Sequence, residues 1–290
     1  MKKGFLFLML IYLVALTGTL LTSGCASKAV QSEALLKSDR HNFPPSYKVI
    51  DVPYIEQKAA QCGPATLAMA MQHAGYLTSA EQVAPQVMTP DKKGTLQQDM
   101  ISASRRNGLM AVQIEGLETL LAEISHGHPV IVFENLSTKW LPKWHYAIVY
   151  GYDLDQQTVT MHSGPEREKV WNIKKFERSW MLGDYWGLVV MPPDEVAFNA
   201  GELANLVAAA GLEQAGNTDQ AQQAYEAILT VWPKSLGALI GLGNIAYARE
   251  DYHLAVFYLK RAQRYHPESL AASHNLKVAA KAANIKLAVQ

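Results

Sequence analysis

The residue best suited to chemistry is Cys62, which opens a strongly helical segment. Gly63-Pro64 signals a helix start, because a proline in the first turn lacks only an N–H that would have no partner there. Residues 65–74 favour a helix, are apolar nearly all round, and are followed by Gly75, which ends it. A thiol at a helix N-terminus lies near unpaired N–H groups and the positive end of the dipole, which favour the thiolate. The pattern predicts a nucleophile at the start of a buried helix.

Gln57 lies five residues before Cys62, where its side-chain amide could donate a hydrogen bond near the sulfur. An amide donor beside a nucleophile is half of an oxyanion hole, the site that stabilises a developing negative oxygen. The alternative is that the cysteine is a small buried hydrophobe that serves only packing. The helix alone favours this second interpretation, so the rest of the chain has to decide.

A second cysteine, Cys25, closes an N-terminal segment of different character. A short positive stretch at residues 1–3 precedes an almost unbroken apolar run at residues 5–21, and small residues then lead to Cys25. The segment resembles the signal peptide of bacterial lipoproteins, in which the cysteine is acylated and becomes the mature N-terminus. Thr22 stands where that pattern usually has leucine, so an uncleaved signal-anchor helix is the alternative.

We therefore expect residues 1–24 to be a signal peptide and residues 25–45 to be a tether. Ala26 after the lipidated Cys25 is typical of sorting to the outer membrane of a Gram-negative bacterium, facing the periplasm. The chain has two cysteines, so lipidation of one leaves Cys62 without a disulfide partner. An unpaired thiol in an oxidising compartment is a liability, which favours a reactive role over packing.

A cysteine nucleophile needs a nearby base, and the chain has nine histidines. His73 lies on the cysteine helix but about 16 Å along its axis, at 1.5 Å per residue. His126 and His128 flank a predicted helix end, where capping of carbonyl groups is their expected role. His145 begins an apolar strand after a tryptophan-containing loop, where a sheet could present a base to the end of a buried helix. Its surroundings alone leave packing and catalysis equally open.

The elements around these residues predict two parts. In residues 46–193 helical segments come first and short apolar strands follow, which is typical of an α+β domain with an antiparallel sheet. Residues 199–290 are alanine-rich and helical, and similar segments end at Pro233 and Pro267, 34 residues apart. That spacing is the period of the tetratricopeptide repeat, so we expect an all-α repeat domain with a capping helix at residues 273–286.

The charge balance argues against one class of partner. Lysine plus arginine and aspartate plus glutamate each number 26, so the formal net charge is zero. A surface that binds nucleic acid normally has an excess of basic residues, and we therefore expect no nucleic-acid partner.

The quoted residues carry a resemblance when they are taken together. Gln57, the run Cys62-Gly63-Pro64-Ala65, and His145-Tyr146-Ala147 leading to Gly151-Tyr152-Asp153 resemble the papain-like cysteine peptidases that process double-glycine leader peptides of bacteriocins, in their stand-alone form. The resemblance spans residues 47–193. It implies a papain-like domain that needs no cofactor or metal. It also implies that Cys62 is the nucleophile, that Gln57 and the Cys62 N–H form the oxyanion hole, and that His145 is the general base and then acid.

The third member of the family's catalytic group is where this sequence departs. The family usually has an aspartate followed by proline on the strand after the histidine, but residues 160–165 read Thr-Met-His-Ser-Gly-Pro. His162 occupies the expected place, and Asp153 or Asp155 in the preceding turn are the substitutes. A histidine there brings no negative charge to stabilise an imidazolium at His145.

These observations predict a lipid-anchored cysteine peptidase that hydrolyses peptides or proteins and binds a protein partner through its repeats. We expect the His145 imidazolium to help keep the thiol ionised. The alternative is a catalytically weak or inactive peptidase-like lipoprotein that acts only by binding through the repeats. A third possibility retains the chemistry but changes the substrate: the acyl group is transferred to an amine instead of water, or the substrate is a cell-wall peptide.

Overall fold

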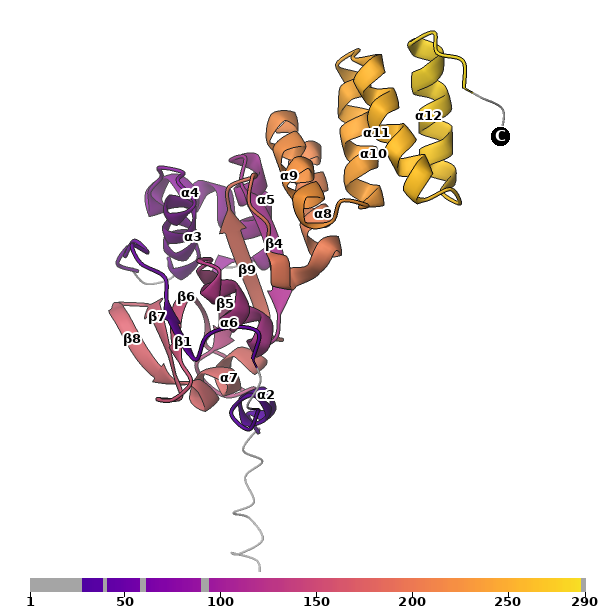
Figure 1. Ribbon diagram of the computed structural model, residues 1–290. Helices are drawn as coiled ribbons and strands as arrows, with labels where there is room; N and C mark the ends of the chain where they lie inside the picture. The colour runs from indigo at the N-terminus through magenta and orange to yellow at the C-terminus, as the bar shows by residue number, and fades with distance from the viewer. Residues whose placement is uncertain (1–27, 39–40, 58–60, 90–93, 288–290) are drawn as a thin grey trace, which may run out of the picture.

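The computed structural model describes residues 28–38, 41–57, 61–89 and 94–287, so the predicted signal peptide and Cys25 lie outside it. An antiparallel sheet forms the centre of the N-terminal half (Figure 1). Its strand order is β4-β9-β5-β6-β7-β8, and β1 pairs with the far end of β6. The bounds are β1 Ser46–Lys48, β4 Met110–Glu115, β5 Val130–Asn135, β6 Trp144–Asp153, β7 Thr158–Ser163, β8 Glu166–Asn172 and β9 Trp186–Met191. Two short strands, β2 Met88–Thr89 and β3 Gly94–Thr95, pair separately.

Helices cover both faces of this sheet. On one face, α3 (Cys62–His73), α4 (Ala80–Val87) and α5 (Gln97–Arg106) share a core with Ile131, Ile148 and Leu188. On the other face, α6 (Leu117–Ser125) and α7 (Ile173–Met181) share a core with the alternate residues of the same strands, Val130, Val132, Ala147, Val149 and Val189. Successive residues of a strand point to opposite faces, which explains the two cores.

Helix α3 forms as the sequence predicts. It begins at Cys62, its residues 63–71 are buried, and Gly75 follows it with a φ of +83°. Gly63 needs to be glycine, because a Cβ atom there would collide with the side chain of Thr95. The expected helix at the cysteine and the α+β order of elements are confirmed.

The sequence did not predict two of the observed elements, because their hydrophobic patterns are weak. Strand β8 is charged and largely exposed, so it lacks the apolar alternation that marks the other strands. Helix α2 (Val30–Leu35) lies within the predicted tether. The carboxylate of Glu177 on α7 accepts hydrogen bonds from the backbone N–H groups of Gln31 and Ser32, at 2.9 and 2.6 Å, so this stretch is packed against the domain.

In the described residues, five α-helices follow the sheet domain and stack side by side (Figure 1). Helices α9 and α11 begin 34 residues apart, at Thr218 and Tyr252, which matches the spacing read from the sequence. The apolar core of the sheet domain continues into α8 and α9 through Ala208, Leu212 and Tyr225. The bounds are α8 Gly201–Gln214, α9 Thr218–Val231, α10 Leu236–Ala248, α11 Tyr252–Tyr265 and α12 Leu270–Ala282. No helix in the described ranges is long and apolar enough to cross a membrane.

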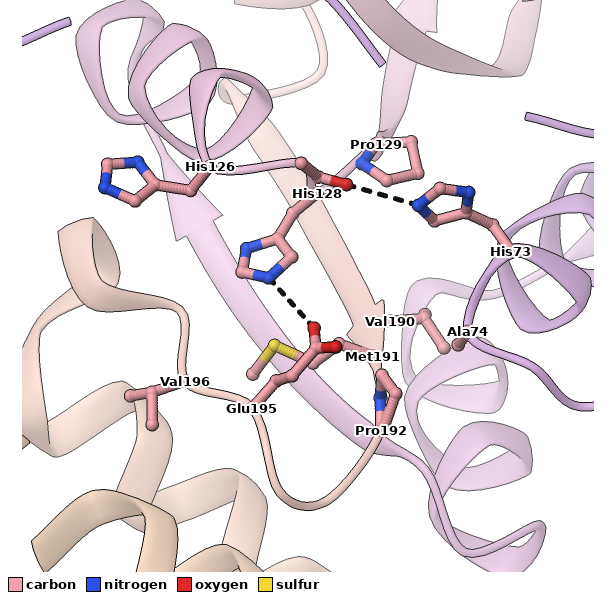
Figure 2. A pocket seen from close by; sticks show the side chains of 11 residues that line it. His73, Ala74, His126, His128, Pro129, Val190, Met191, Pro192, Glu195 and Val196 are labelled. Atoms are coloured by element: carbon pink, nitrogen blue, oxygen red, sulfur yellow. Dashed lines mark hydrogen bonds and ion pairs between the residues drawn. The ribbon is translucent and has the colours of Figure 1, made fainter. Parts of the chain in front are cut away.

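A cavity of about 480 Å³ lies beyond the C-terminal end of α3, between the α6–β5 turn and the segment after β9 (Figure 2). His73, His126, His128 and Glu195 line it. His126 Nδ1 lies 2.8 Å from the carbonyl oxygen of Ala122, which is the capping role expected from the sequence. In the part of the chain that the structure describes, no three acidic, histidine or cysteine side chains are arranged to hold a metal ion.

His128 joins two elements beside this cavity. Its Nδ1 lies 2.8 Å from Glu123 of α6, and its Nε2 lies 3.2 Å from Glu195, which follows β9. Burial lowers the pKa of His128, but the two carboxylates outweigh it and raise that pKa to about 9. The protonated ring therefore stabilises the fold below pH 6.5, and this contribution is lost as the pH rises through 9.

We expect His128→Gln to lower the free energy of unfolding by roughly 2–3 kcal/mol at pH 6, and by clearly less at pH 10. Denaturant titration at the two pH values measures the difference. His126→Gln is the matched control, because His126 caps a carbonyl and has no carboxylate partner among the described residues; its effect should be small at both pH values. An equal loss at pH 6 and pH 10 for His128→Gln would contradict the assignment.

Candidate active site

Cys62 is the first residue of α3 and is partly exposed at the end of the buried helix. One turn further on, the Thr66 hydroxyl donates to the backbone oxygen of Tyr146 in β6, at 3.3 Å. Burial, followed by the nearby charge of Cys62, raises the pKa of the Tyr146 hydroxyl. The thiol therefore lies where the helix N-terminus meets the beginning of β6.

Gln57 connects the cysteine helix with the turn after β7. Its Nε2 donates to Thr66 Oγ1 at 3.1 Å, and its Oε1 accepts the backbone N–H of Gly164 at 3.2 Å. A methyl group at Gly164 would lie 4.0 Å from Cε1 of His145, so the turn reaches the histidine ring. The Gln57 amide is thus held against Thr66, one helical turn beyond Cys62.

His145 lies at the start of β6, with its ring partly buried. Its Nε2 lies 3.1 Å from Ser163 Oγ. Its Nδ1 has no hydrogen bond with any residue that the structure describes, and within the same residues no hydrogen bond joins Cys62 Sγ to His145. Nδ1 could therefore form a further hydrogen bond.

The electrostatic environment keeps the His145 ring uncharged. Burial, and then the positive charges of Lys169 and Lys143, lower its pKa to about 4. At neutral pH the ring is therefore a neutral imidazole. The expectation that a His145 imidazolium helps to ionise the thiol is corrected by this environment.

Ser163, and not His162, is the neighbour of His145. Ser163 pairs with Ala147 and so lies on the same face of the sheet as His145, whereas His162 pairs with Ile148 on the opposite face. His162 Nδ1 accepts the Glu168 N–H at 3.2 Å and its Nε2 lies 3.3 Å from the Val52 carbonyl. The residue predicted to contact His145, His162, is therefore one position away from the residue that does, Ser163. In a strand, a shift of one position places a side chain on the opposite face of the sheet.

The two aspartates considered as substitutes are not near the histidine. Asp153 is the last residue of β6, eight residues from His145, or about 26 Å at 3.3 Å per residue. Its carboxylate accepts the Gln156 N–H at 2.8 Å within the hairpin turn, and Asp155 lies in the same turn.

The structure adds a residue that sequence reasoning missed. Glu134 lies in β5 and is paired directly with His145 in the neighbouring strand. A charged residue directly after the apolar run at residues 130–133 of this strand was the signal that could have identified it.

The N-terminal half of the chain is similar to known proteins. Residues 49–186, just under half of the chain, match the model of the family described as Peptidase_C39 like family. The N-terminal half therefore holds a domain similar to the C39 peptidases, and helices follow it. A search of curated proteins found no match.

Solved structures of similar domains exist at low sequence identity. A C39-like peptidase from Bacillus anthracis has 16% identity and a TM-score of 0.44, and the match covers 50% of this chain and 97% of that one. The peptidase domain of Streptococcus ComA, a bifunctional ABC transporter of a quorum-sensing pathway, has 24% identity and a TM-score of 0.39, covering 50% and 98%. A double glycine motif protease of an AMS/PCAT transporter, in complex with its leader peptide, has 20% identity and a TM-score of 0.39, covering 50% and 93%.

Proposed function

We propose that this protein is a cysteine peptidase that hydrolyses peptide bonds through a thioester at Cys62. The observation that carries the proposal is the set of contacts around Gln57, which joins the helix of Cys62 to the turn that lies against His145. The match of residues 49–186 to the C39-like peptidases supports the same chemistry.

The residues have distinct roles in the proposed reaction. Nδ1 of neutral His145 takes the thiol proton while Cys62 Sγ attacks the carbonyl carbon of the peptide, and the carbonyl oxygen becomes an oxyanion. The Gln57 amide and the Cys62 backbone N–H stabilise that oxyanion. The imidazolium then gives its proton to the leaving amine, the C–N bond breaks, and water hydrolyses the remaining thioester with His145 acting as base again.

Ser163 orients the base in this proposal. When its hydroxyl oxygen accepts the Nε2–H proton of His145, the lone pair on Nδ1 is free to take the thiol proton. A serine supplies no negative charge, so it holds the ring but does little to stabilise the imidazolium that forms during the reaction.

The surroundings of His145 favour a peptide substrate with apolar side chains. In the segment that leads into β6 and includes its first residue, the exposed fractions of Trp140, Leu141 and Trp144 are 94%, 75% and 49%. The Trp144 ring stacks on that of Phe133, with ring centroids 4.9 Å apart. Large exposed apolar groups beside a catalytic residue are typical of a surface that binds a partner or substrate. We further propose that the helices after residue 199 are tetratricopeptide repeats that bind a protein partner.

The roles of these residues predict a graded loss of activity. On a library of fluorogenic peptides at pH 7.5, we expect no detectable turnover for Cys62→Ala and a loss of about 10³-fold or more in kcat/KM for His145→Ala. Gln57→Ala should lose roughly 10²-fold, and Ser163→Ala roughly 10-fold. His126→Gln, a surface histidine at a helix end, is the control and should keep wild-type activity.

Two outcomes of this assay would overturn the peptidase. One is hydrolysis that survives in Cys62→Ala, which would place the nucleophile elsewhere. The other is an inert wild-type protein whose thiol fails to react with peptide electrophiles, which would leave the binding lipoprotein as the function. Transfer to an added amine in place of hydrolysis would retain the residues and change the acceptor.

We also propose that the mature protein is attached to the outer membrane by a lipid on Cys25 and faces the periplasm. The small residues before Cys25, behind an apolar run, support this. Cys25→Ser should abolish incorporation of a labelled fatty acid and retain the signal peptide, as read by gel mobility and mass. If the wild-type protein takes up no label, the proposed lipid anchor is ruled out, and the proposed peptidase activity is unaffected.

A further inference from the structure

Glu134 is a buried carboxyl group beside the proposed base. It lies in β5, is 0% exposed, and is paired directly with His145 across the antiparallel β5–β6 ladder. Residues paired in this way project from the same face of the sheet, with Cβ atoms about 5 Å apart. Ser163 lies on that same face, so the histidine has a serine on one neighbouring strand and a carboxyl group on the other.

A side-chain hydrogen bond from Ser179 holds the carboxyl group of Glu134. Ser179 Oγ on α7 lies 2.8 Å from Glu134 Oε2 and 2.8 Å from the Phe176 carbonyl oxygen. The serine hydroxyl donates to the Glu134 carboxylate, and this hydrogen bond favours the ionised form of Glu134. Oε1 of Glu134 is buried and has no hydrogen-bond partner within the described ranges.

The same environment brings the ionisation of Glu134 close to neutral pH. Burial raises its pKa to about 7, although the Ser179 hydrogen bond and the charge of Lys169 oppose the increase. Its charge therefore changes in the pH range where a peptidase of this kind would work.

We propose that Glu134 is a positioning residue for His145, and that it supplies from β5 the negative charge that Ser163 cannot supply from β7. This inference rests on the proposed peptidase function. When Glu134 is ionised, its charge favours the imidazolium that forms as the thiol proton moves to His145. When it is protonated, that stabilisation is absent and His145 is a weaker base.

Two lysines near His145 disfavour a positive charge on its ring. A negative charge on Glu134 would compensate for them. Lys169 of β8 and Lys143 before β6 both lower the pKa of His145. Glu166 forms an ion pair with Lys169, Nζ to Oε1 2.8 Å, which partly balances one of them.

Two other buried carboxyl groups on the helices packed against β5 have different partners. On α7, Glu177 accepts the Gln31 and Ser32 N–H groups. On α6, Glu123 contacts His128. Strand β9 has no titratable side chain. Tyr146 and His162 occupy strand positions on the opposite face, and His73 lies at the far end of α3.

The test is an NMR titration of the His145 ring in the full chain. In the wild type we expect its nitrogen resonances to show two inflections, one near pH 4 from its own protonation and one near pH 7 from Glu134. Glu134→Gln should remove the second inflection. Glu177→Gln, which alters another fully buried carboxyl group with partners on α2, should leave it in place.

Should Glu134→Gln fail to fold, Ser179→Ala provides an independent test. It removes the hydrogen bond that lowers the pKa of Glu134, so the upper inflection should move to higher pH. An inflection near pH 7 that persists in Glu134→Gln, or that stays unmoved in Ser179→Ala, would overturn the inference.

Kinetics separate this inference from the peptidase proposal. Wild-type kcat should rise about tenfold more than that of Glu134→Gln between pH 6 and pH 8, with KM unchanged, because only the wild type gains a charge beside the base. Equal pH profiles in an active enzyme would overturn the role of Glu134 alone. An inactive wild type that retains both inflections would overturn the peptidase and leave the coupling of the two side chains standing.

Discussion

The alternation of side chains along β6 and its neighbours is the constraint on which the site depends. Because every second residue shares a face, His145 meets Ser163 from β7 and Glu134 from β5, whereas His162 is directed to the other side. The register of these strands is fixed by the apolar residues that follow His145, which fill a separate core on each face. A slip of one residue would bury the base among apolar side chains and expose the core.

The second requirement is a fixed relation between the cysteine helix and this sheet. Helix α3 packs its apolar side chains against one face, and Thr66 and Gln57 tie its first turns to Tyr146 and Gly164. The proposed nucleophile is therefore on a helix packed against the sheet, and the proposed base is on a central strand. Such placement limits the motion of catalytic groups better than loops do.

Much of this could be predicted from sequence, because the relevant signals are local. The helix at Cys62 is specified by a proline, a run of helix formers and a glycine, and the strand at His145 by an apolar run of strand formers. The partner of His145 could not be predicted, because it depends on the register between strands, and a composition pattern does not reveal register. Glu134 was missed for the same reason, since its importance arises only from the residue opposite it. The neutral state of His145 depends on burial and on Lys169, which comes from β8, a strand without an apolar pattern.

The central claim is that Cys62, His145 and Gln57 act together on a peptide carbonyl group. A crystal structure of the protein treated with a peptide aldehyde tests this most directly, because an aldehyde forms a hemithioacetal with a catalytic thiol. The account predicts a covalent bond to Cys62 Sγ, with His145 Nδ1 and Gln57 Nε2 within hydrogen-bond distance of the adduct, about 3 Å, and Nε2 of His145 still on Ser163. An aldehyde that leaves Cys62 unmodified, or an adduct whose oxygen points away from Gln57, would contradict it.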